Sequence, residues 1–317
     1  MRTVAASTRS SSSRAEFPVW PATTGYVKIP ANPLSDGGTD RKDPEMTVRP
    51  DRIVVPLDES AFSESALPIA EQLALALGAE IDLLAAGWGS NVVELQAYLD
   101  ERRAPLRTAS STIVAPDTFP ATAIADALSG DGDIVVMATH GRSGIGRALL
   151  GSVAEDVLQR SDHPAVLLGP NADPTRAIAG APLAVTTDGS PLSAMILPRV
   201  TTWAKALGMP VIVLGVVAGG GTPLGGGDRD SLDTAMGSAV TFLTAEGVEA
   251  SAAVLIGAEA DRAIVEWLRD DAVGATAGLV AMTSHGRGGI ARTALGSTAM
   301  KVVHDSPAPT LVHRPRR

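Results

Sequence analysis

Two short segments carry the residues best suited to bind phosphate. They are HGRSGIGRALLGS (140–152) and HGRGGIARTALGS (285–297), which align without a gap at an offset of 145 residues. Each has a glycine directly after a predicted strand, where backbone N–H groups can turn toward an anion because no Cβ intrudes. Each ends in Gly-Ser at the start of a predicted helix, where free N–H groups and the helix dipole favour phosphate. The candidate residues are Gly141, Arg142, Gly151 and Ser152 in the first segment and Gly286, Arg287, Gly296 and Ser297 in the second.

The same segments also have an ordinary structural explanation. Glycine after a strand and Gly-Ser before a helix are common turn and cap residues. Two copies that keep the same His-Gly-Arg and Gly-Ser pairs favour a phosphate site in at least one of them. We expect His140 and His285, which open the segments, to shape the loops rather than to catalyse.

An aspartate ends the first strand of each predicted domain. Asp58 follows RIVVPL and Asp188 follows PLAVTT. In an open parallel sheet of this type, ligands sit beyond the carboxyl ends of the strands, at the crevice between the first and fourth strands. Each aspartate is therefore predicted to lie beside one of the glycine-containing segments. The alternative is structural, because Asp-x-Ser after a strand is also a turn and N-cap signal.

A third glycine-rich stretch, GGGTPLGGGDRD (219–230), does not predict a phosphate site. It lacks the Gly-Lys-Ser/Thr of a P-loop, and it follows the second strand of its repeat rather than the first. We expect a surface loop there.

The positioning elements alternate between strand and helix, and their order runs twice along the chain. The first pass predicts strands at 52–58, 79–87, 106–115, 133–141 and 164–170, and helices at 60–77, 121–128 and 151–160. The second predicts strands at 182–190, 210–218, 248–256, 278–286 and 309–315, and a helix at 191–207. This alternation implies right-handed crossovers and a parallel sheet covered on both faces. The predicted fold is α/β, with two tandem doubly wound five-stranded parallel-sheet domains at 49–172 and 177–317 after a disordered tail at 1–48.

Composition excludes several classes of protein. The formal net charge of −9 argues against nucleic-acid binding, which usually needs a cation-rich surface. The absence of cysteine excludes disulfides, thiol catalysis and cysteine-based metal sites, and it fits a reducing cytoplasm. No apolar run reaches the roughly 18 residues that a membrane helix needs. We therefore expect a cytoplasmic protein without a nucleic-acid or membrane partner.

The two segments resemble the motif of the nucleotide-binding branch of the universal stress protein family. That motif is glycine, two residues, glycine, nine residues, then Gly-Ser or Gly-Thr. Here the first copy runs from Ala138 through Gly141 to Gly151, and the second from Thr283 through Gly286 to Gly296. Alanine and threonine thus replace the first glycine. The resemblance covers about residues 51–317.

The resemblance implies Rossmann-like domains of the adenine nucleotide alpha hydrolase-like kind. They would bind ATP, AMP or ADP, with or without Mg²⁺. Asp58 and Asp188 would face adenine, and Ala138 and Thr283 would lie near the ribose. The remaining implied roles are phosphate contacts from Gly141, Gly151, Ser152, Gly286, Gly296 and Ser297, with further backbone contacts from Val153 and Thr298.

The last strand of each half is predicted to lie at a sheet edge. PAVLLGP and PTLVHRP are apolar, and an exposed apolar edge invites pairing. Single-domain members of the family usually dimerise through this strand, so the resemblance implies an intrachain pseudo-dimer of the two halves. Independent domains on the NADPTR linker and a homodimer of the whole chain stay as alternatives.

Three functions are compatible with these residues. The first is a regulatory protein of the stress response that binds an adenine nucleotide. The second is a slow ATPase or nucleotidyl-transfer enzyme, but the segments contain no Asp or Glu that could hold Mg²⁺ beside the phosphates, and we predict no catalytic or metal-ligating residue. The third is a structural dimer module with vestigial sites.

Overall fold

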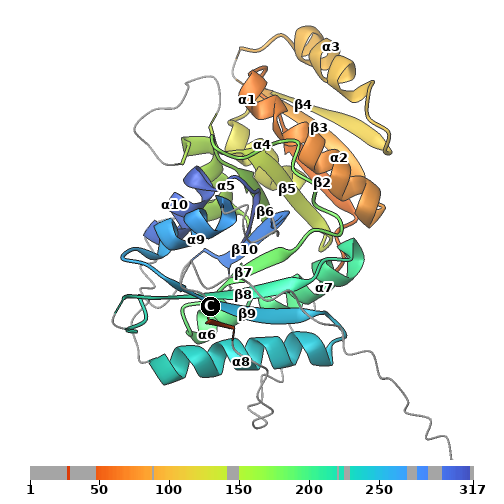
Figure 1. Ribbon diagram of the computed structural model, residues 1–317. Coiled ribbons are helices and arrows are strands. Elements are labelled where there is room, and N and C mark those ends of the chain that lie inside the picture. The colour runs from red at the N-terminus through yellow and green to blue at the C-terminus, as the bar shows by residue number, and fades with distance from the viewer. Residues whose placement is uncertain are drawn as a thin grey trace, which may run out of the picture.

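The described strands of the protein form a single sheet. The computed structural model describes residues 27–28, 48–87, 89–140, 150–219, 221–224, 229–269, 277–284 and 295–314. The sheet has eleven strands in the order β1-β9-β8-β7-β10-β11-β6-β5-β2-β3-β4 (Figure 1). Within the five strands of each half, all neighbours pair in parallel. The predicted fold class, tandem α/β domains with parallel sheets, is confirmed.

The two halves repeat the same element order. The first contains β2 (Arg52–Pro56), α1 (Ala61–Glu64), α2 (Ala66–Leu77), β3 (Glu80–Gly87), α3 (Val92–Arg103), β4 (Ser110–Pro116), α4 (Pro120–Ala127), β5 (Asp133–Ala138), α5 (Ser152–Arg160) and β6 (Ala165–Leu168). The second contains β7 (Leu183–Thr186), α6 (Pro191–Ala194), α7 (Leu197–Leu207), β8 (Val211–Val217), α8 (Arg229–Ala245), β9 (Ala250–Ile256), α9 (Ala260–Arg269), β10 (Leu279–Thr283), α10 (Ser297–Asp305) and β11 (Thr310–His313). The strand order reverses between β2 and β5 and again between β7 and β10.

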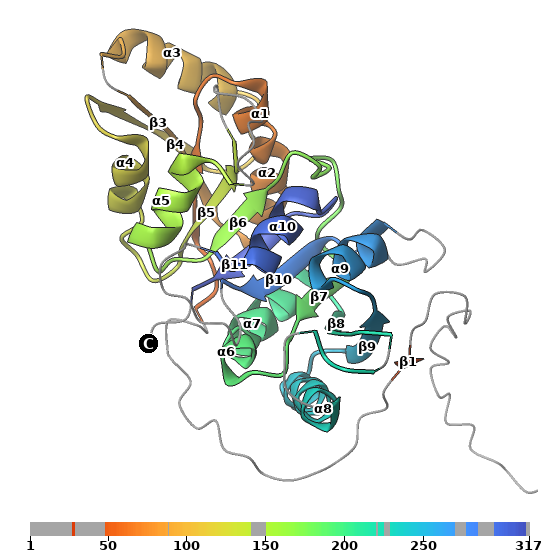
Figure 2. The same cartoon turned by 90° about the vertical axis from the view of Figure 1, so that its left-hand side faces the viewer.

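Helices cover both faces of the sheet because successive strand residues point to opposite sides. In β2, Ile53 and Val55 join one apolar cluster and Val54 joins the other. The first cluster lies under α2, α3, α7 and α8, and the second under α4, α5, α9 and α10. Figure 2 looks onto the second of these helix layers.

The helix predicted at 60–77 is wrong at one point, because the structure breaks it into α1 and α2. A proline ring clashes with the carbonyl four residues before it. Four residues before Pro68 is Glu64, the last residue of α1. The same break separates α6 from α7, where Ala194 precedes Pro198 by four residues. The predicted glycine C-cap of α2 is confirmed: Gly78 takes the left-handed conformation at φ 67°.

Three helices, α3, α8 and α9, have no counterpart among the predicted elements. Of the long α3, only Leu95 and Leu99 are buried, so its sequence carries a weak apolar stripe. Arg229 begins α8, so the surface loop predicted at 219–230 ends there; of the preceding part the structure describes residues 219 and 221–224.

The two halves join through their last strands, as predicted. β6 and β11 pair antiparallel, with Val166 opposite Leu311. The carboxyl ends of the strands therefore point in opposite directions in the two halves. This arrangement is the pseudo-dimer, in which one chain covers both edges. The exact domain ends at 172 and 177 stay predictions.

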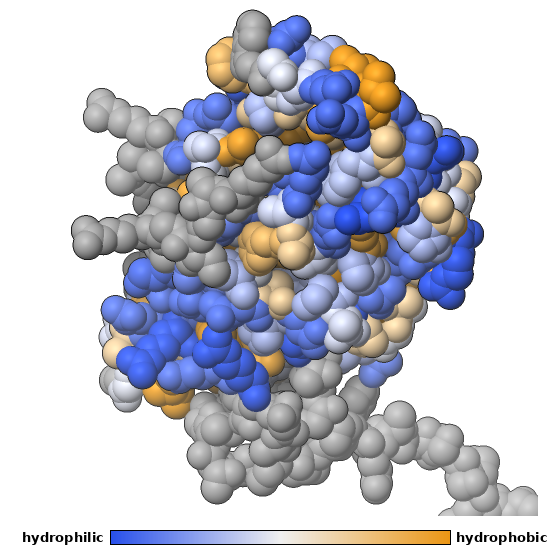
Figure 3. Space-filling model, turned by 90° about the horizontal axis from the view of Figure 1, so that it is seen from above, coloured by the Kyte–Doolittle hydropathy of each residue, from blue (hydrophilic) through white to orange (hydrophobic). Residues whose placement is uncertain are grey.

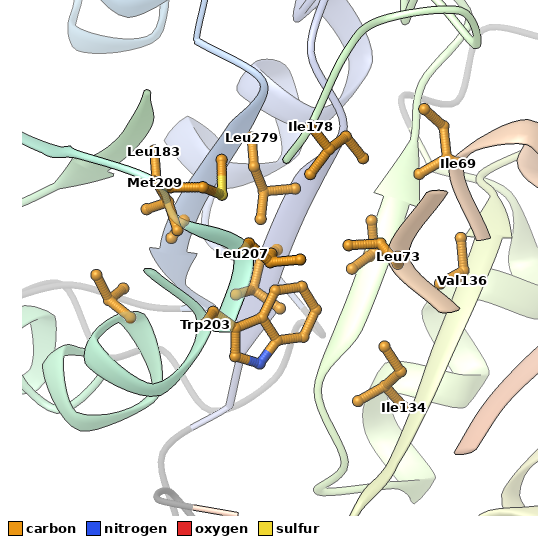
Figure 4. Packing of buried hydrophobic residues seen from close by; sticks show 14 of the residues in the cluster. Ile69, Leu73, Ile134, Val136, Ile178, Leu183, Trp203, Leu207, Met209 and Leu279 are labelled. Atoms are coloured by element: carbon orange, nitrogen blue, oxygen red, sulfur yellow. The ribbon is translucent and has the colours of Figure 1, made fainter. Parts of the chain in front are cut away.

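The linker is packed rather than loose. Ile178 is buried between the halves, and it lies between Leu279 of β10 and Leu73 of α2 (Figure 4). The Gln72 side chain bonds the carbonyl of Arg176 and the N–H of Ile178 at 3.1 and 3.2 Å. One continuous core therefore crosses the junction, which argues against independently moving domains.

A short piece of the N-terminal segment is also ordered into the sheet. Within 1–48, predicted to be disordered, residues 27–28 form β1 (Val27–Lys28), which pairs antiparallel with the edge of β9.

Seen from the α3 end, the described surface is mostly hydrophilic, with small and separate apolar patches (Figure 3). Among the described helices, none has the length and apolarity needed to cross a membrane.

Candidate functional site

In each half, the first and fourth strands lie side by side, and their carboxyl ends point in the same direction. β2 pairs with β5 and β7 pairs with β10, all in parallel, so their carboxyl ends share an edge. Asp58 lies beyond β2, and Ala138 ends β5. Asp188 and Thr283 hold the same places in the second half. Because the strands of the two halves run in opposite directions, the two candidate sites lie at opposite ends of the strands.

Gly151 is required by a close approach of the backbone. Its N–H donates to the carbonyl oxygen of Thr139 at 2.8 Å, which closes the segment between β5 and α5. A Cβ at Gly151 would lie 2.3 Å from that same oxygen, well inside any real contact. The second half repeats the bond between Gly296 N–H and the Ser284 carbonyl at 2.7 Å. Each glycine therefore brings a helix N-terminus against the end of a strand.

The first turns of α5 and α10 present backbone N–H groups at this edge. Gly151 and Gly296 are the N-cap residues and have no side chain to cap them. Intrahelical bonding begins at Glu155 and Met300, which donate to the cap carbonyls at 3.0 and 2.9 Å. Earlier N–H groups in a helix have no intrahelical acceptor and favour anions. The first two residues of each turn, for which phosphate contacts were predicted, are Ser152 and Val153 in α5 and Ser297 and Thr298 in α10.

The two aspartates are held by the serine two residues later. Asp58 Oδ1 accepts from the backbone N–H and the hydroxyl of Ser60, at 3.2 and 2.5 Å. Asp188 Oδ1 accepts from the Ser190 N–H at 2.9 Å. Both serines are N-caps, so the turn-and-cap interpretation is correct. The cap also fixes each carboxylate beyond the carboxyl end of its strand, where the sequence predicts a binding role.

The residue after each aspartate has a left-handed backbone. Glu59 has φ 64°, and its counterpart Gly189 has φ 76°. Glycine adopts this conformation without cost, whereas other residues pay about 1–2 kcal/mol. The first site thus contains a strained residue that the second avoids.

Ala138 and Thr283 fill the positions where the motif has its first glycine. Both are 7% exposed at the ends of their strands, and Thr283 pairs with His313 of β11. Small side chains fit this packed position. The carbonyls of Thr139 and Ser284, which anchor the cap glycines, were missed from the sequence. The signal was available, because these two residues also stand 145 positions apart.

Part of the predicted site lies outside the described residues. It comprises Gly141, Arg142, Gly286 and Arg287, together with His285.

Helix α3 is fastened to the helix that follows Asp58. The Tyr98 hydroxyl donates to Glu64 Oε1 at 2.9 Å, and Arg102 Nε lies 2.9 Å from the same oxygen. Burial, reinforced by the Glu64 carboxylate, raises the pKa of the Tyr98 hydroxyl well above its usual value.

In the described part of the chain, no three His, Cys, Asp or Glu side chains are grouped to hold a metal ion.

Comparison with known proteins gives one consistent result. The sequence model of the Universal stress protein family matches residues 88–168 and 182–314. A universal stress protein of Mycolicibacterium smegmatis is 29% identical over 186 residues, and one of Mycobacterium tuberculosis is 27% identical over 194. These matches cover 58% and 59% of this chain and 62% and 63% of the relatives, so the chain spans less than two thirds of the relatives it matches.

Solved structures agree on the fold. A universal stress protein from Archaeoglobus fulgidus superposes with a TM-score of 0.59 at 21% identity, covering 83% of this chain and 98% of its own. A functionally unknown protein from Pseudomonas aeruginosa gives 0.58 at 16% identity, covering 86% and 95%. At this identity the likeness concerns the fold alone.

Proposed function

The chain belongs to the universal stress protein family, and we propose that it binds an adenine nucleotide in each half and regulates a stress response through that occupancy. The observation that carries the proposal is the repeated glycine cap. Gly151 and Gly296 each bond the carbonyl at the end of the neighbouring strand. Each thereby directs a helix N-terminus toward the edge where an aspartate is also fixed.

The proposed contacts follow from this geometry. Phosphates bind the first turns of α5 and α10 because free N–H groups and the helix dipole favour negative charge there. The base lies toward Asp58 in the first site and Asp188 in the second, with the ribose beside Ala138 and Thr283. ATP, ADP and AMP all fit this chemistry, and any Mg²⁺ would arrive with the phosphates.

Nucleotide is expected to stabilise the folded protein. A ligand present at about 100 times its Kd adds roughly 2.7 kcal/mol to the free energy of unfolding by mass action. Thermal unfolding with millimolar ATP, ADP and AMP measures the shift, and titration calorimetry should give about two nucleotides per chain. If no nucleotide shifts the melting temperature and none is bound in calorimetry, the proposed function is wrong. Product analysis in the same samples separates a binding protein from a slow ATPase.

Ser152→Asp and Ser297→Asp are expected to silence one site each. Both serines are exposed first residues of their helices, where a carboxylate stabilises the helix by about 0.3–1 kcal/mol. The same carboxylate occupies the phosphate position and repels the ligand. Stoichiometry should fall from two to one in each single variant and to zero in the double.

Ser152→Ala and Ser297→Ala are the matched controls. They remove only a hydroxyl, so the backbone donors remain and stoichiometry should stay at two. Two bound nucleotides in a folded Ser152→Asp/Ser297→Asp protein would place the sites elsewhere.

A further inference from the structure

A histidine of the second half lies against the first site. His304 is in the last turn of α10, and its ring centroid is 6.1 Å from that of His140 in an edge-to-face arrangement. The His140 ring also meets Phe62 of α1, with the ring centroids again 6.1 Å apart. His140 is buried at 8% exposure, and the His304 side chain is 20% exposed. Edge-to-face packing of this kind stabilises a fixed ring position.

The position of His304 is set by contacts across the junction. Asn171 donates to the His304 carbonyl at 3.1 Å, and the His304 ring bonds Asp305 at 2.8 Å. Gly169, just after β6, lets the end of α10 come this close, since a Cβ there would lie 2.0 Å from the Val303 carbonyl oxygen. His304 is therefore held in place by the first half.

His140 is in turn connected to the phosphate end of the first site. Its Nδ1 lies 3.0 Å from the hydroxyl of Thr139. The carbonyl of Thr139 accepts from Gly151, the N-cap of α5. A displaced His140 ring would thus disturb the residue that anchors the helix N-terminus.

The sequence gives the second half no ring at the position of His304. The residue of α5 that corresponds to His304 at the 145-residue offset is Gln159. Gln159 is exposed and has no ring; its side chain bonds Glu155 at 3.4 Å in its own helix. The two halves therefore differ in the residue that stands at the His304 position.

We propose that His304 is a positioning residue of the first nucleotide site, contributed across the junction by the second half. Its ring holds His140, and through Thr139 it keeps Gly151 and the first turn of α5 in the geometry that binds phosphate. The inference rests on the proposed nucleotide binding and adds that the two sites are unequal.

The test uses proteins in which only one site binds. The Ser297→Asp chain retains the first site, and the Ser152→Asp chain retains the second. In the first-site chain, His304→Ala and His304→Gln should each raise the Kd for ATP roughly two- to ten-fold, the loss expected for one ring–ring contact. His304→Phe keeps an aromatic ring and loses the bond to Asp305. Because the proposal assigns the effect to the ring, this variant should have the Kd of the first-site chain that still contains His304. In the second-site chain all three substitutions should leave the Kd unchanged, and Gln159→Ala should change neither site.

Each other result overturns the proposal in a recognisable way. An unchanged Kd for His304→Ala in the first-site chain shows that the contact does not matter, while two-site binding by the unaltered chain keeps the proposed function. Equal weakening of both sites indicates a general loss of structure. A Phe variant as weak as Ala assigns the effect to the Asp305 bond rather than to the ring. Absence of ATP binding by the unaltered chain removes the proposed function and this inference together.

Discussion

Replacing Gly169 by alanine is expected to cost about 2–4 kcal/mol of folding free energy, although it adds a single methyl group. The new Cβ would lie 2.0 Å from the carbonyl oxygen of Val303 and 2.9 Å from that of His304. Both are backbone atoms and cannot rotate away, so α10 must retreat from the junction. Thermal unfolding should show a melting temperature lower by roughly 5–10 °C.

Gly237→Ala provides the matched control for that prediction. Gly237 lies within α8, and no atom that its Cβ would meet lies within 4 Å. Alanine is the better helix former, so this variant should gain about 0.5–1 kcal/mol. The same chemical change thus has opposite signs at the two positions. If Gly169→Ala melts at the temperature of the unaltered chain, α10 is not packed against the end of β6 as described.

Asp133→Ala is expected to cost about 3 kcal/mol, because it leaves a partly buried guanidinium without its main partner. Asp133 has a side chain only 4% exposed, and it accepts from Arg52 Nε at 2.9 Å. It also accepts the backbone N–H groups of Ser129 and Gly130, both at 2.7 Å. Arg52 bonds Asp82 as well, at 2.9 Å. Chemical denaturation of the variant measures the loss.

Acid should remove the same stabilisation from the unaltered chain. Burial by itself raises the pKa of the Asp133 carboxyl, but the hydrogen bonds from Arg52 and from the two N–H groups outweigh it and hold the pKa below its usual value. A carboxyl with a lowered folded pKa contributes stability above its unfolded pKa of about 4, and that contribution is lost as the pH falls through the lower folded value. Asp133→Ala should therefore show a flatter loss of stability on acidification below about pH 4.

Asp100→Ala is the control for the ion-pair prediction. Its partner Arg103 lies at 3.1 Å, but both side chains are over 40% exposed, and such surface pairs contribute about 0–1 kcal/mol. A loss at Asp133 no greater than that at Asp100 would show that the network around Arg52 does not stabilise the fold.

The ion-pair network also distinguishes the halves. The strand registers place Pro182 and Gly278 where the first half has Arg52 and Asp133, and Ile212 where it has Asp82. Near Gly278 a linker residue makes the contact instead, since Arg176 Nε donates to the carbonyl of Ala277 at 2.7 Å. At the amino ends of the strands, the first half is therefore held by ion pairs, and the second half by a hydrogen bond from the linker.

The sequence by itself determined the duplication, the α/β class and the position of the glycine caps. These features depend on local chemistry, because β-branched apolar runs form buried strands and glycine allows close backbone approach. The helix breaks were not predicted, although Pro68 and Pro198 carry the signal for them. The apolar last strands PAVLLGP and PTLVHRP, together with the resemblance to the family, also led to the prediction that the two halves pair.

Only the tertiary structure decided which distant side chains meet. His304 reaches His140, and Arg52 reaches Asp133, because strand pairing and helix packing bring together residues that no local pattern relates. Gly169 was predicted only as part of the strand at 164–170, and the structure places it against α10. The physical reason is that propensity and periodicity fix each element and its buried face, whereas contacts across the junction depend on how two finished layers dock.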